Sequence, residues 1–174
     1  TILVHKASLA TFIYDAKGEL IGSFAAERRR LLDLDDVAPV MRQAIVAVED
    51  VRFYTHWGID PLGIARAAFS NLRKGKIRQG ASTLTQQLVR LLVLKRERTL
   101  RRKIIEAISA VRLELSLSKD EILERYLNLV YFGRGAYGVA AAARTYFDKE
   151  ASELIAEEAA LLAGLVQAPG RYRP

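Results

Sequence analysis

The stretch Ala47-Val-Glu-Asp-Val-Arg-Phe-Tyr-Thr-His-Trp-Gly58 is the one around which the rest of this chain is organised. Apolar residues at helical spacing from Met41 to Val48 lead into it, so one face of that helix is apolar. Glu49 lies one turn beyond Ile45, on the edge of the apolar face. A carboxylate half removed from water at a helix end tends to have a raised pKa, which a general acid or base needs. The alternative is a solvated acid pair, Glu49 and Asp50, and this stretch alone favours neither interpretation.

The composition is that of a globular domain with an excess of positive charge. Of 174 residues, 51% are hydrophobic and 27% are charged, so the chain can bury a core. Lys and Arg number 27 against 20 Asp and Glu, and the resulting charge of +7 suggests nucleic acid, an acidic membrane or a phosphorylated substrate as partner. Because Cys is absent, disulfides, zinc–thiolate sites and thiol nucleophiles are excluded.

The ends of the chain suggest that it is a piece of a longer protein. No apolar run approaches the roughly 18 to 20 residues that span a bilayer, and no stretch reads as a signal peptide. The chain starts without Met and ends at Arg171-Tyr-Arg-Pro174. We therefore expect that any membrane anchor lies outside it.

Strands are predicted only near the N-terminus. Residues 10–24 read as two short strands around Asp15-Ala-Lys-Gly18, because Gly18 can take the positive φ that a hairpin loop requires. We interpret this hairpin as a surface element without a catalytic or binding role. Residues 131–138 read instead as a glycine-rich loop that contains Arg134.

Helices account for most of the remaining sequence. Pro39 and Pro61 begin two of them, and Ser118 with Glu121 forms a capping box that begins another. A last helix is predicted to be capped near Ser152. The sequence therefore predicts one mainly α-helical domain over residues 1–174.

Residues 80–88, Gly-Ala-Ser-Thr-Leu-Thr-Gln-Gln-Leu, form a second informative stretch. Thr83 and Gln86 fit a capping box, so a helix begins here with its backbone N–H groups and positive dipole end exposed. Such a helix start is suited to an oxyanion or a sugar. Simple capping leaves unexplained the polar residues around the pair: Ser82, Thr85 and Gln87.

A basic segment, residues 95–103, precedes a helix whose apolar residues recur from Ile104 to Leu115. Arg102 and Lys103 lie four and three residues before Glu106, so the three share a helix face. A solvent-side ion pair would contribute only about 0.2–0.5 kcal/mol. An isolated acid within so basic a segment is also typical of a phosphate site, where Arg and Lys bind the anion.

Five motifs follow one another along the chain. They are Glu49-Asp50-x-x-Phe53-x-x-His56-x-Gly58, Gly80-x-Ser82-Thr83-x-Thr85-Gln86-Gln87, Arg102-Lys103-x-x-Glu106, Ile122-Leu-Glu-x-Tyr-Leu-Asn128 and Arg134-Gly-x-x-Gly138. In this order they resemble the peptidoglycan glycosyltransferase domain of glycosyltransferase family 51, found in class A penicillin-binding proteins and monofunctional transglycosylases. The likeness covers nearly the whole chain, and five motifs in order are highly specific.

The resemblance implies a lysozyme-like helical fold with a head and a small membrane-contacting jaw, a mobile region at about residues 59–80. It implies a longer protein anchored at the outer (periplasmic or extracytoplasmic) face of the bacterial cell membrane. The implied substrate is lipid II, an undecaprenyl-pyrophosphate-linked disaccharide peptide, which the domain would polymerise with inversion at the donor sugar. The implied partners are lipid II, the nascent glycan strand, an anionic membrane surface and a fused or associated transpeptidase.

The matching motifs also imply roles for particular residues. Glu49 would be the general base on the acceptor hydroxyl, and Glu106 the second carboxylate. The residues implied to bind the donor phosphates and sugars are Ser82, Thr83, Gln86, Gln87, Arg90, Arg98, Arg102, Lys103 and Arg134. The supporting residues around the base would be Asp50, Phe53 and His56. Arg90-Leu91 departs from the Lys-Asn that is frequent in the family. Arg keeps the positive charge of Lys, but its planar guanidinium donates hydrogen bonds in a different geometry from an ammonium group.

Two other functions stay open on the residues alone. A lysozyme-like glycan hydrolase or lytic enzyme would not need the basic cluster, because its sugar leaving group is neutral. A helical nucleic-acid-binding module is supported mainly by the net charge. It would not explain the two adjacent carboxylates of Glu49 and Asp50. We expect no nucleic-acid partner, no required cofactor and no metal site, although the adjacent carboxylates of Glu49 and Asp50 could attract a divalent ion such as Mg²⁺ or Mn²⁺.

Overall fold

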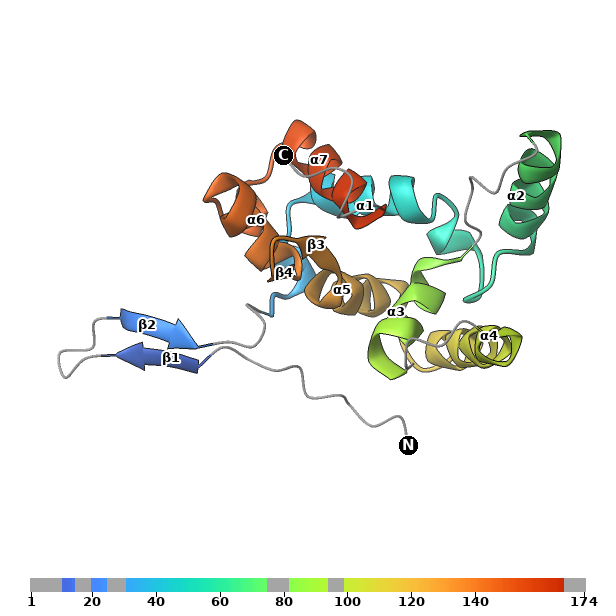
Figure 1. The fold of residues 1–174 in the computed structure, drawn as a ribbon, viewed down its shortest axis with the longest axis horizontal. Coiled ribbons are helices and arrows are strands. Elements are labelled where there is room, and N and C mark those ends of the chain that lie inside the picture. Colours follow the sequence, from blue (N-terminus) through green and yellow to red (C-terminus); the bar gives the residue numbers. More distant parts are fainter. Residues whose placement is uncertain (1–10, 15–19, 25–30, 75–81, 94–98, 168–174) are drawn as a thin grey trace. The chain divides into compact units, whose positions relative to one another are not determined.

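The computed structural model describes residues 11–14, 20–24, 31–74, 82–93 and 99–167. In these ranges the chain forms seven α-helices, three short 3₁₀ helices and two two-stranded sheets (Figure 1). The predicted mainly α fold class is therefore confirmed. The chain divides into two compact units, one formed by residues 1–44 with 127–174 and the other by residues 45–126.

The first unit begins with the predicted N-terminal strands. Strand β1 (Thr11–Tyr14) pairs antiparallel with β2 (Leu20–Phe24), as the sequence predicts. Gly18 and the rest of the predicted turn lie outside the described residues. A 3₁₀ helix, η1 (Leu34–Asp36), then precedes α1 (Pro39–Glu49), which begins at the predicted proline.

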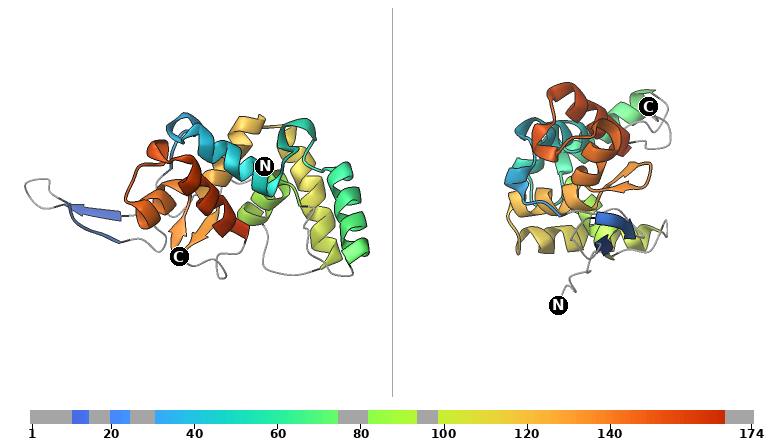
Figure 2. Two further views of the ribbon diagram at one scale, coloured as in Figure 1. Left: turned by 90° about the horizontal axis from the view of Figure 1, so that it is seen from above. Right: turned by 90° about the vertical axis from the view of Figure 1, so that its left-hand side faces the viewer.

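The C-terminal part of the first unit packs helices against a second small sheet. Strands β3 (Tyr131–Gly133) and β4 (Ala136–Tyr137) are followed by α6 (Val139–Phe147), η3 (Ala151–Glu153) and α7 (Ala156–Gln167). Helix α6 packs against β3, β4 and η3, and α7 packs against β3 (Figure 2). Ala142 and Ala143 are fully buried, because small side chains let α6 approach its neighbours closely.

The β3–β4 hairpin corrects the interpretation of residues 131–138 as a loop. Tyr131 pairs with Tyr137 and Gly133 with Ala136. Arg134 and Gly135 both have positive φ, 49° and 75°, as in a two-residue turn that matches the twist of its strands. Strands this short carry no alternating pattern, so the sequence alone could not reveal them.

The start of the last helix is also corrected. Ser152 lies in η3, whose start is capped by reciprocal contacts between Glu150 and Glu153. Helix α7 begins later, where the backbone N–H of Ile155 donates to the Glu158 carboxylate at 3.1 Å. The predicted cap was one short helix too early, because two capping sequences follow each other closely here.

The second unit, residues 45–126, contains the end of α1 and most of the remaining helices. They are η2 (Phe53–Thr55), α2 (Pro61–Lys74), α3 (Leu84–Val93), α4 (Leu100–Glu114) and most of α5 (Lys119–Leu129). Pro61 and the Ser118–Glu121 capping box begin α2 and α5 as predicted. Helix α5 has an apolar face that is buried, with Ile122, Leu123 and Tyr126 fully inaccessible.

The apolar faces of α2 and α4 are exposed among the described residues. On α2, Phe69 and Leu72 are 68% and 84% exposed, and on α4, Ile104 and Ile108 are 61% and 52% exposed. The buried face of α4 carries Glu106 together with two small or apolar residues. Periodicity identifies an apolar face but does not say what covers it. None of the described helices is both long enough and apolar enough to cross a bilayer.

Candidate active site

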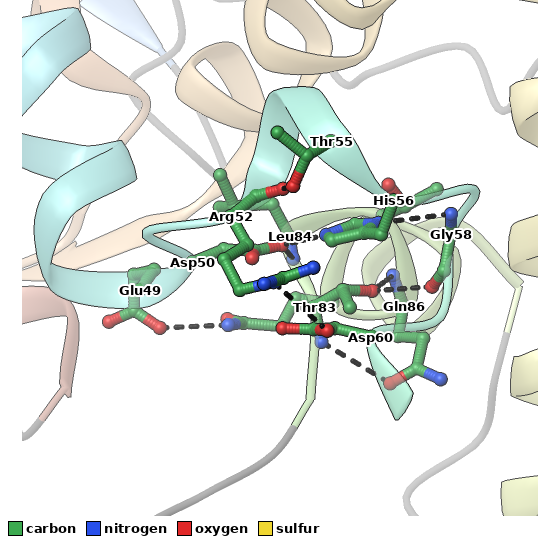
Figure 3. A network of polar contacts seen from close by, with 12 residues as sticks. Glu49, Asp50, Arg52, Thr55, His56, Gly58, Asp60, Thr83, Leu84 and Gln86 are labelled. Atoms are coloured by element: carbon green, nitrogen blue, oxygen red, sulfur yellow. Dashed lines mark hydrogen bonds and ion pairs between the residues drawn. The ribbon is translucent and has the colours of Figure 1, made fainter. Parts of the chain in front are cut away.

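The site is built where α1 ends and α3 begins, within the second unit (Figure 3). Glu49 is the last residue of α1, and Asp50 is the first residue after it. One oxygen of Asp50, Oδ2, accepts hydrogen bonds from the backbone N–H of Leu84 and from His56 Nε2, both at 2.9 Å. Asp50 therefore ties the end of one helix to the start of another.

The start of α3 is occupied by this carboxylate. Thr83 and Gln86 form the predicted capping box, in which the Thr83 N–H reaches Gln86 Oε1 at 3.3 Å and the Gln86 N–H reaches Thr83 Oγ1 at 3.2 Å. Both residues are buried, as are Leu84 and Thr85. The expectation that this helix start is exposed is therefore wrong. The sequence could not show that the anion at the positive end of α3 is Asp50, 34 residues earlier in the chain.

His56 and Gly58 hold the loop that faces Asp50. The backbone N–H of Gly58 donates to His56 Nδ1 at 3.2 Å, so His56 donates to Asp50 from a protonated Nε2. Gly58 has a φ of 83°, and a Cβ at this position would lie 2.8 Å from the Ala110 backbone carbonyl. Only glycine fits there, because both the conformation and the space exclude a side chain.

Phe53 packs beneath this loop and links it to a half-buried cation, Lys119. The Phe53 ring is fully buried and meets the His56 ring edge to face, with centroids 6.3 Å apart. The ammonium group of Lys119 lies 4.7 Å from the Phe53 centroid and donates to the His56 carbonyl oxygen at 2.7 Å. The three residues predicted to support the base therefore share one buried assembly.

Glu49 has a different environment from its neighbour. Its Oε2 accepts a hydrogen bond from Gln87 Nε2 at 2.7 Å, while its Oε1 is buried and has no hydrogen-bond partner among the described residues. Burial raises the pKa of Glu49 above its ordinary value, and the charge of Asp50 adds to this, whereas the Gln87 hydrogen bond and the charge of Arg90 lower it. The raised pKa of Glu49 is the one that its position at the helix end predicts.

Gln87 is held from its other side by Tyr126. The hydroxyl of Tyr126 donates to Gln87 Oε1 at 3.0 Å. Tyr126 is fully buried, and burial, with the charge of Glu49 as a further cause, raises the pKa of its hydroxyl far above the ordinary range. The hydroxyl therefore stays protonated and able to donate.

A second carboxylate lies on α4, which packs against α3. Glu106 is completely buried, and its Oε1 accepts from Lys103 Nζ at 2.6 Å, while the same ammonium group donates to Ser82 Oγ at 2.9 Å. The alternative of a solvent-side ion pair is wrong, because a fully buried carboxylate is not solvated. Glu106 Oε2 and Arg102 Nε are buried without hydrogen-bond partners among the described residues, so each has an unused bonding position.

The remaining predicted residues are distributed as follows. Arg90 lies on α3, is exposed, and acts on Glu49 through its charge. Arg98 lies outside the described residues. Arg134 is exposed at the β3–β4 turn of the first unit, where its guanidinium lies 5.5 Å from the Tyr146 centroid.

Sequence reasoning missed a polar network behind the site. Lys119 Nζ also donates to Glu114 Oε1 at 2.7 Å, and the Thr85 hydroxyl donates to the same oxygen at 2.6 Å. The sequence offers no signal for the Thr85 contact, because that residue lies 29 positions before Glu114. No site role is predicted for Tyr126 from the sequence, although a tyrosine on a buried face usually has a hydrogen-bond partner.

The two adjacent carboxylates do not converge on one point. Asp50 is directed to Leu84 and His56 (Figure 3). Glu49 is hydrogen-bonded instead to Gln87. Within the described part of the chain, no group of three or more His, Cys, Asp or Glu side chains gathers as a metal site would require.

The chain matches the model of a family described as transglycosylase over residues 17–174. Penicillin-binding protein 1A of Aquifex aeolicus is 50% identical over 95% of this chain and 23% of that protein. The proteins of the same name from Neisseria gonorrhoeae and Neisseria flavescens are 48% and 46% identical over 98% of this chain and 21% of each relative. The chain thus spans about a fifth of the length of these curated relatives.

Proposed function

Because the chain belongs to the transglycosylase family, and is therefore a peptidoglycan glycosyltransferase and a hexosyltransferase, we propose that it polymerises lipid II with Glu49 as general base. The acceptor sugar hydroxyl gives its proton to Glu49 and attacks the anomeric carbon of the donor. The bond from that carbon to the lipid pyrophosphate breaks with inversion, and the pyrophosphate leaves with the electron pair. The growing glycan strand is one of the two sugar partners in each step.

The observation that carries the proposal is the state of the Glu49 carboxylate. Burial raises its pKa, and its Oε1 is buried without a partner among the described residues. A base with a raised pKa takes a proton more readily, provided that it is ionised at the working pH. An acceptor hydroxyl donating to Oε1 would complete the hydrogen bonding of the site.

The cluster of Lys103, Glu106 and Ser82 supports a role on the donor side. A departing pyrophosphate develops negative charge, and fixed cations stabilise such charge most effectively. Lys103 Nζ donates to Glu106 Oε1 at 2.6 Å and to Ser82 Oγ at 2.9 Å, so these two acceptors fix the position of the ammonium group. Arg102 has an unused Nε in the same helix turn, and Arg90 supplies a further positive charge. We assign donor binding to these residues of the second unit.

The exposed apolar faces of α2 and α4 support contact with a membrane. Phe69 and Leu72 on α2, and Ile104 on α4, are more than half exposed. Basic side chains share these helices and would favour an anionic lipid surface. This fits a membrane-contacting jaw at about residues 59–80 beside a lysozyme-like head, in a longer protein anchored at the outer face of the bacterial membrane and carrying a transpeptidase. The chemistry proposed requires no cofactor.

The test is Glu49→Gln in the full-length protein. We expect loss of lipid II polymerisation, by at least about 100-fold as for removal of a general base, while the variant still unfolds cooperatively and at a temperature no lower than the wild type. Glu157→Gln is the matched control, because Glu157 is an exposed carboxylate in the first turn of α7. Polymerisation at the control rate by Glu49→Gln would show that another group is the base. Incubation with finished glycan in place of lipid II would detect a hydrolase instead.

A further inference from the structure

Three side chains from three helices form a directed chain of hydrogen bonds that ends at the general base. Tyr126 on α5 donates its hydroxyl proton to Gln87 Oε1 at 3.0 Å. Gln87 on α3 donates from Nε2 to Glu49 Oε2, at the end of α1, at 2.7 Å. All three residues belong to the second unit, so this chain lies within one compact body.

The order of donors and acceptors in this chain allows only one orientation of the Gln87 carboxamide. A carboxylate can only accept, so it needs the NH₂ end of the amide. If the carboxamide flipped, its oxygen would face Glu49 Oε2, and the Tyr126 hydroxyl would need another acceptor for its proton. Because Tyr126 is fully buried, water cannot replace the lost partner. The tyrosine hydroxyl thus selects the orientation that serves Glu49.

We propose that Tyr126 is a positioning residue for the reaction: it holds the Gln87 carboxamide so that Gln87 binds Glu49 Oε2 and leaves Oε1 to take the acceptor proton. The inference rests on the proposed function, since it concerns the same base. In the step itself the acceptor O–H bond breaks and the proton goes to Oε1. The acceptor oxygen forms its bond to the anomeric carbon, and the pyrophosphate departs with the electrons of the broken bond.

Two features of Glu49 support the choice of Oε1. Oε2 is engaged by Gln87, while Oε1 is the buried oxygen without a partner among the described residues. A carboxylate held through one oxygen cannot rotate freely, so its other oxygen has a fixed direction. The Gln87 hydrogen bond also lowers the pKa of Glu49 against the effect of burial, which keeps the base ionised to lower pH.

The test is Tyr126→Phe in the full-length protein, with kcat/KM for lipid II followed as a function of pH. The substitution keeps the buried ring and removes only the hydroxyl. With Gln87 no longer held, we expect the acidic limb of the profile to move to higher pH by roughly 0.5 to 1 unit, because the charge-assisted bond to Glu49 is weakened. At pH values below the acidic limb, this shift lowers kcat/KM about 3- to 10-fold. KM should change little, because Tyr126 does not touch the substrate.

Tyr146→Phe is the matched control. Its hydroxyl donates to the Phe132 carbonyl oxygen at 3.0 Å in the first unit, so it also loses one hydrogen bond from a packed tyrosine. Its acidic limb should coincide with that of the wild type. A limb shifted equally in both variants would overturn the inference, because a general loss of stability would then account for it.

Gln87→Met provides a second variant, which removes both hydrogen bonds of the carboxamide and keeps the side-chain length. It should move the acidic limb in the same direction, and Tyr126→Phe should add nothing in the Gln87→Met background. Additive effects, or an unshifted limb in folded Tyr126→Phe, would overturn the inference. If Tyr126→Phe does not fold, the Gln87→Met profile decides alone, and an unshifted limb there is a refutation. Activity retained in Glu49→Gln would instead refute the proposed function, so the two failures are distinct.

Discussion

Asp50 offers a way to separate a charge from the hydrogen bonds that it makes. Both of its contacts, to the Leu84 N–H and to His56 Nε2, go to the single oxygen Oδ2. An asparagine with its amide oxygen in that place can keep both hydrogen bonds and lose only the charge. Asp50→Ala loses the charge and both bonds. Comparison of the two variants therefore measures what each part contributes to the stability of the site.

The expected magnitudes follow from these contacts. Asp50→Asn loses the attraction between a carboxylate and the positive end of α3 and weakens two charge-assisted bonds, which together cost about 1–2 kcal/mol. Asp50→Ala leaves two buried donors without an acceptor, each costing about 1–3 kcal/mol, so the total is about 2–6 kcal/mol. In a domain of this size each kcal/mol lowers the unfolding temperature by about 2–4 °C.

The measurements are thermal unfolding and the pH profile of kcat/KM. The charge of Asp50 is one cause of the raised pKa of Glu49, so Asp50→Asn should move the acidic limb to lower pH. This is the direction opposite to that expected for Tyr126→Phe. If Asp50→Ala is no less stable than Asp50→Asn, the two hydrogen bonds contribute nothing and the reasoning is refuted. A limb that moves to higher pH in Asp50→Asn would refute the electrostatic part alone.

Two further predictions concern stability. Folding raises the pKa of Glu49, so this carboxyl group stabilises the fold fully below its ordinary pKa of 4.5. That stabilisation is lost as pH rises through the folded pKa. Glu49→Gln should therefore unfold at a higher temperature than the wild type at neutral pH, and the difference should vanish at acidic pH; an inactive variant with lowered stability at neutral pH would contradict this. Gly58→Ala should lower the unfolding free energy by about 3 kcal/mol or more, because alanine is strained at φ 83° and its Cβ meets the Ala110 backbone at 2.8 Å. Gly164→Ala, with no atom near its added Cβ inside α7, is the control and should gain about 0.5–1 kcal/mol in the same unfolding measurement.

The parts of this structure that could be predicted from the sequence are those that depend on neighbours along the chain. Capping at Thr83 and Ser118 needs a partner three residues away, and the buried face of α5 follows from helical spacing. The placement of the Asp50 carboxylate at the start of α3 spans 34 residues, and the Tyr126 contact with Gln87 spans 39. Neither leaves a local pattern, because tertiary packing brings these side chains together. For the same reason the sequence predicts candidate site residues but not which of their polar groups are buried or already hydrogen-bonded.

The division of labour between Glu49 and Asp50 arises because α1 ends between them. The last helical residue turns one carboxylate toward Gln87, and the next residue turns its carboxylate toward α3 and His56. One oxygen of Asp50 has two donors, which suits an anion that holds two segments together. Glu49 has a single donor and one buried oxygen without a partner in the described structure. A general base needs such an oxygen, and a structural anion does not, so the number of donors at each carboxylate supports Glu49 as the base.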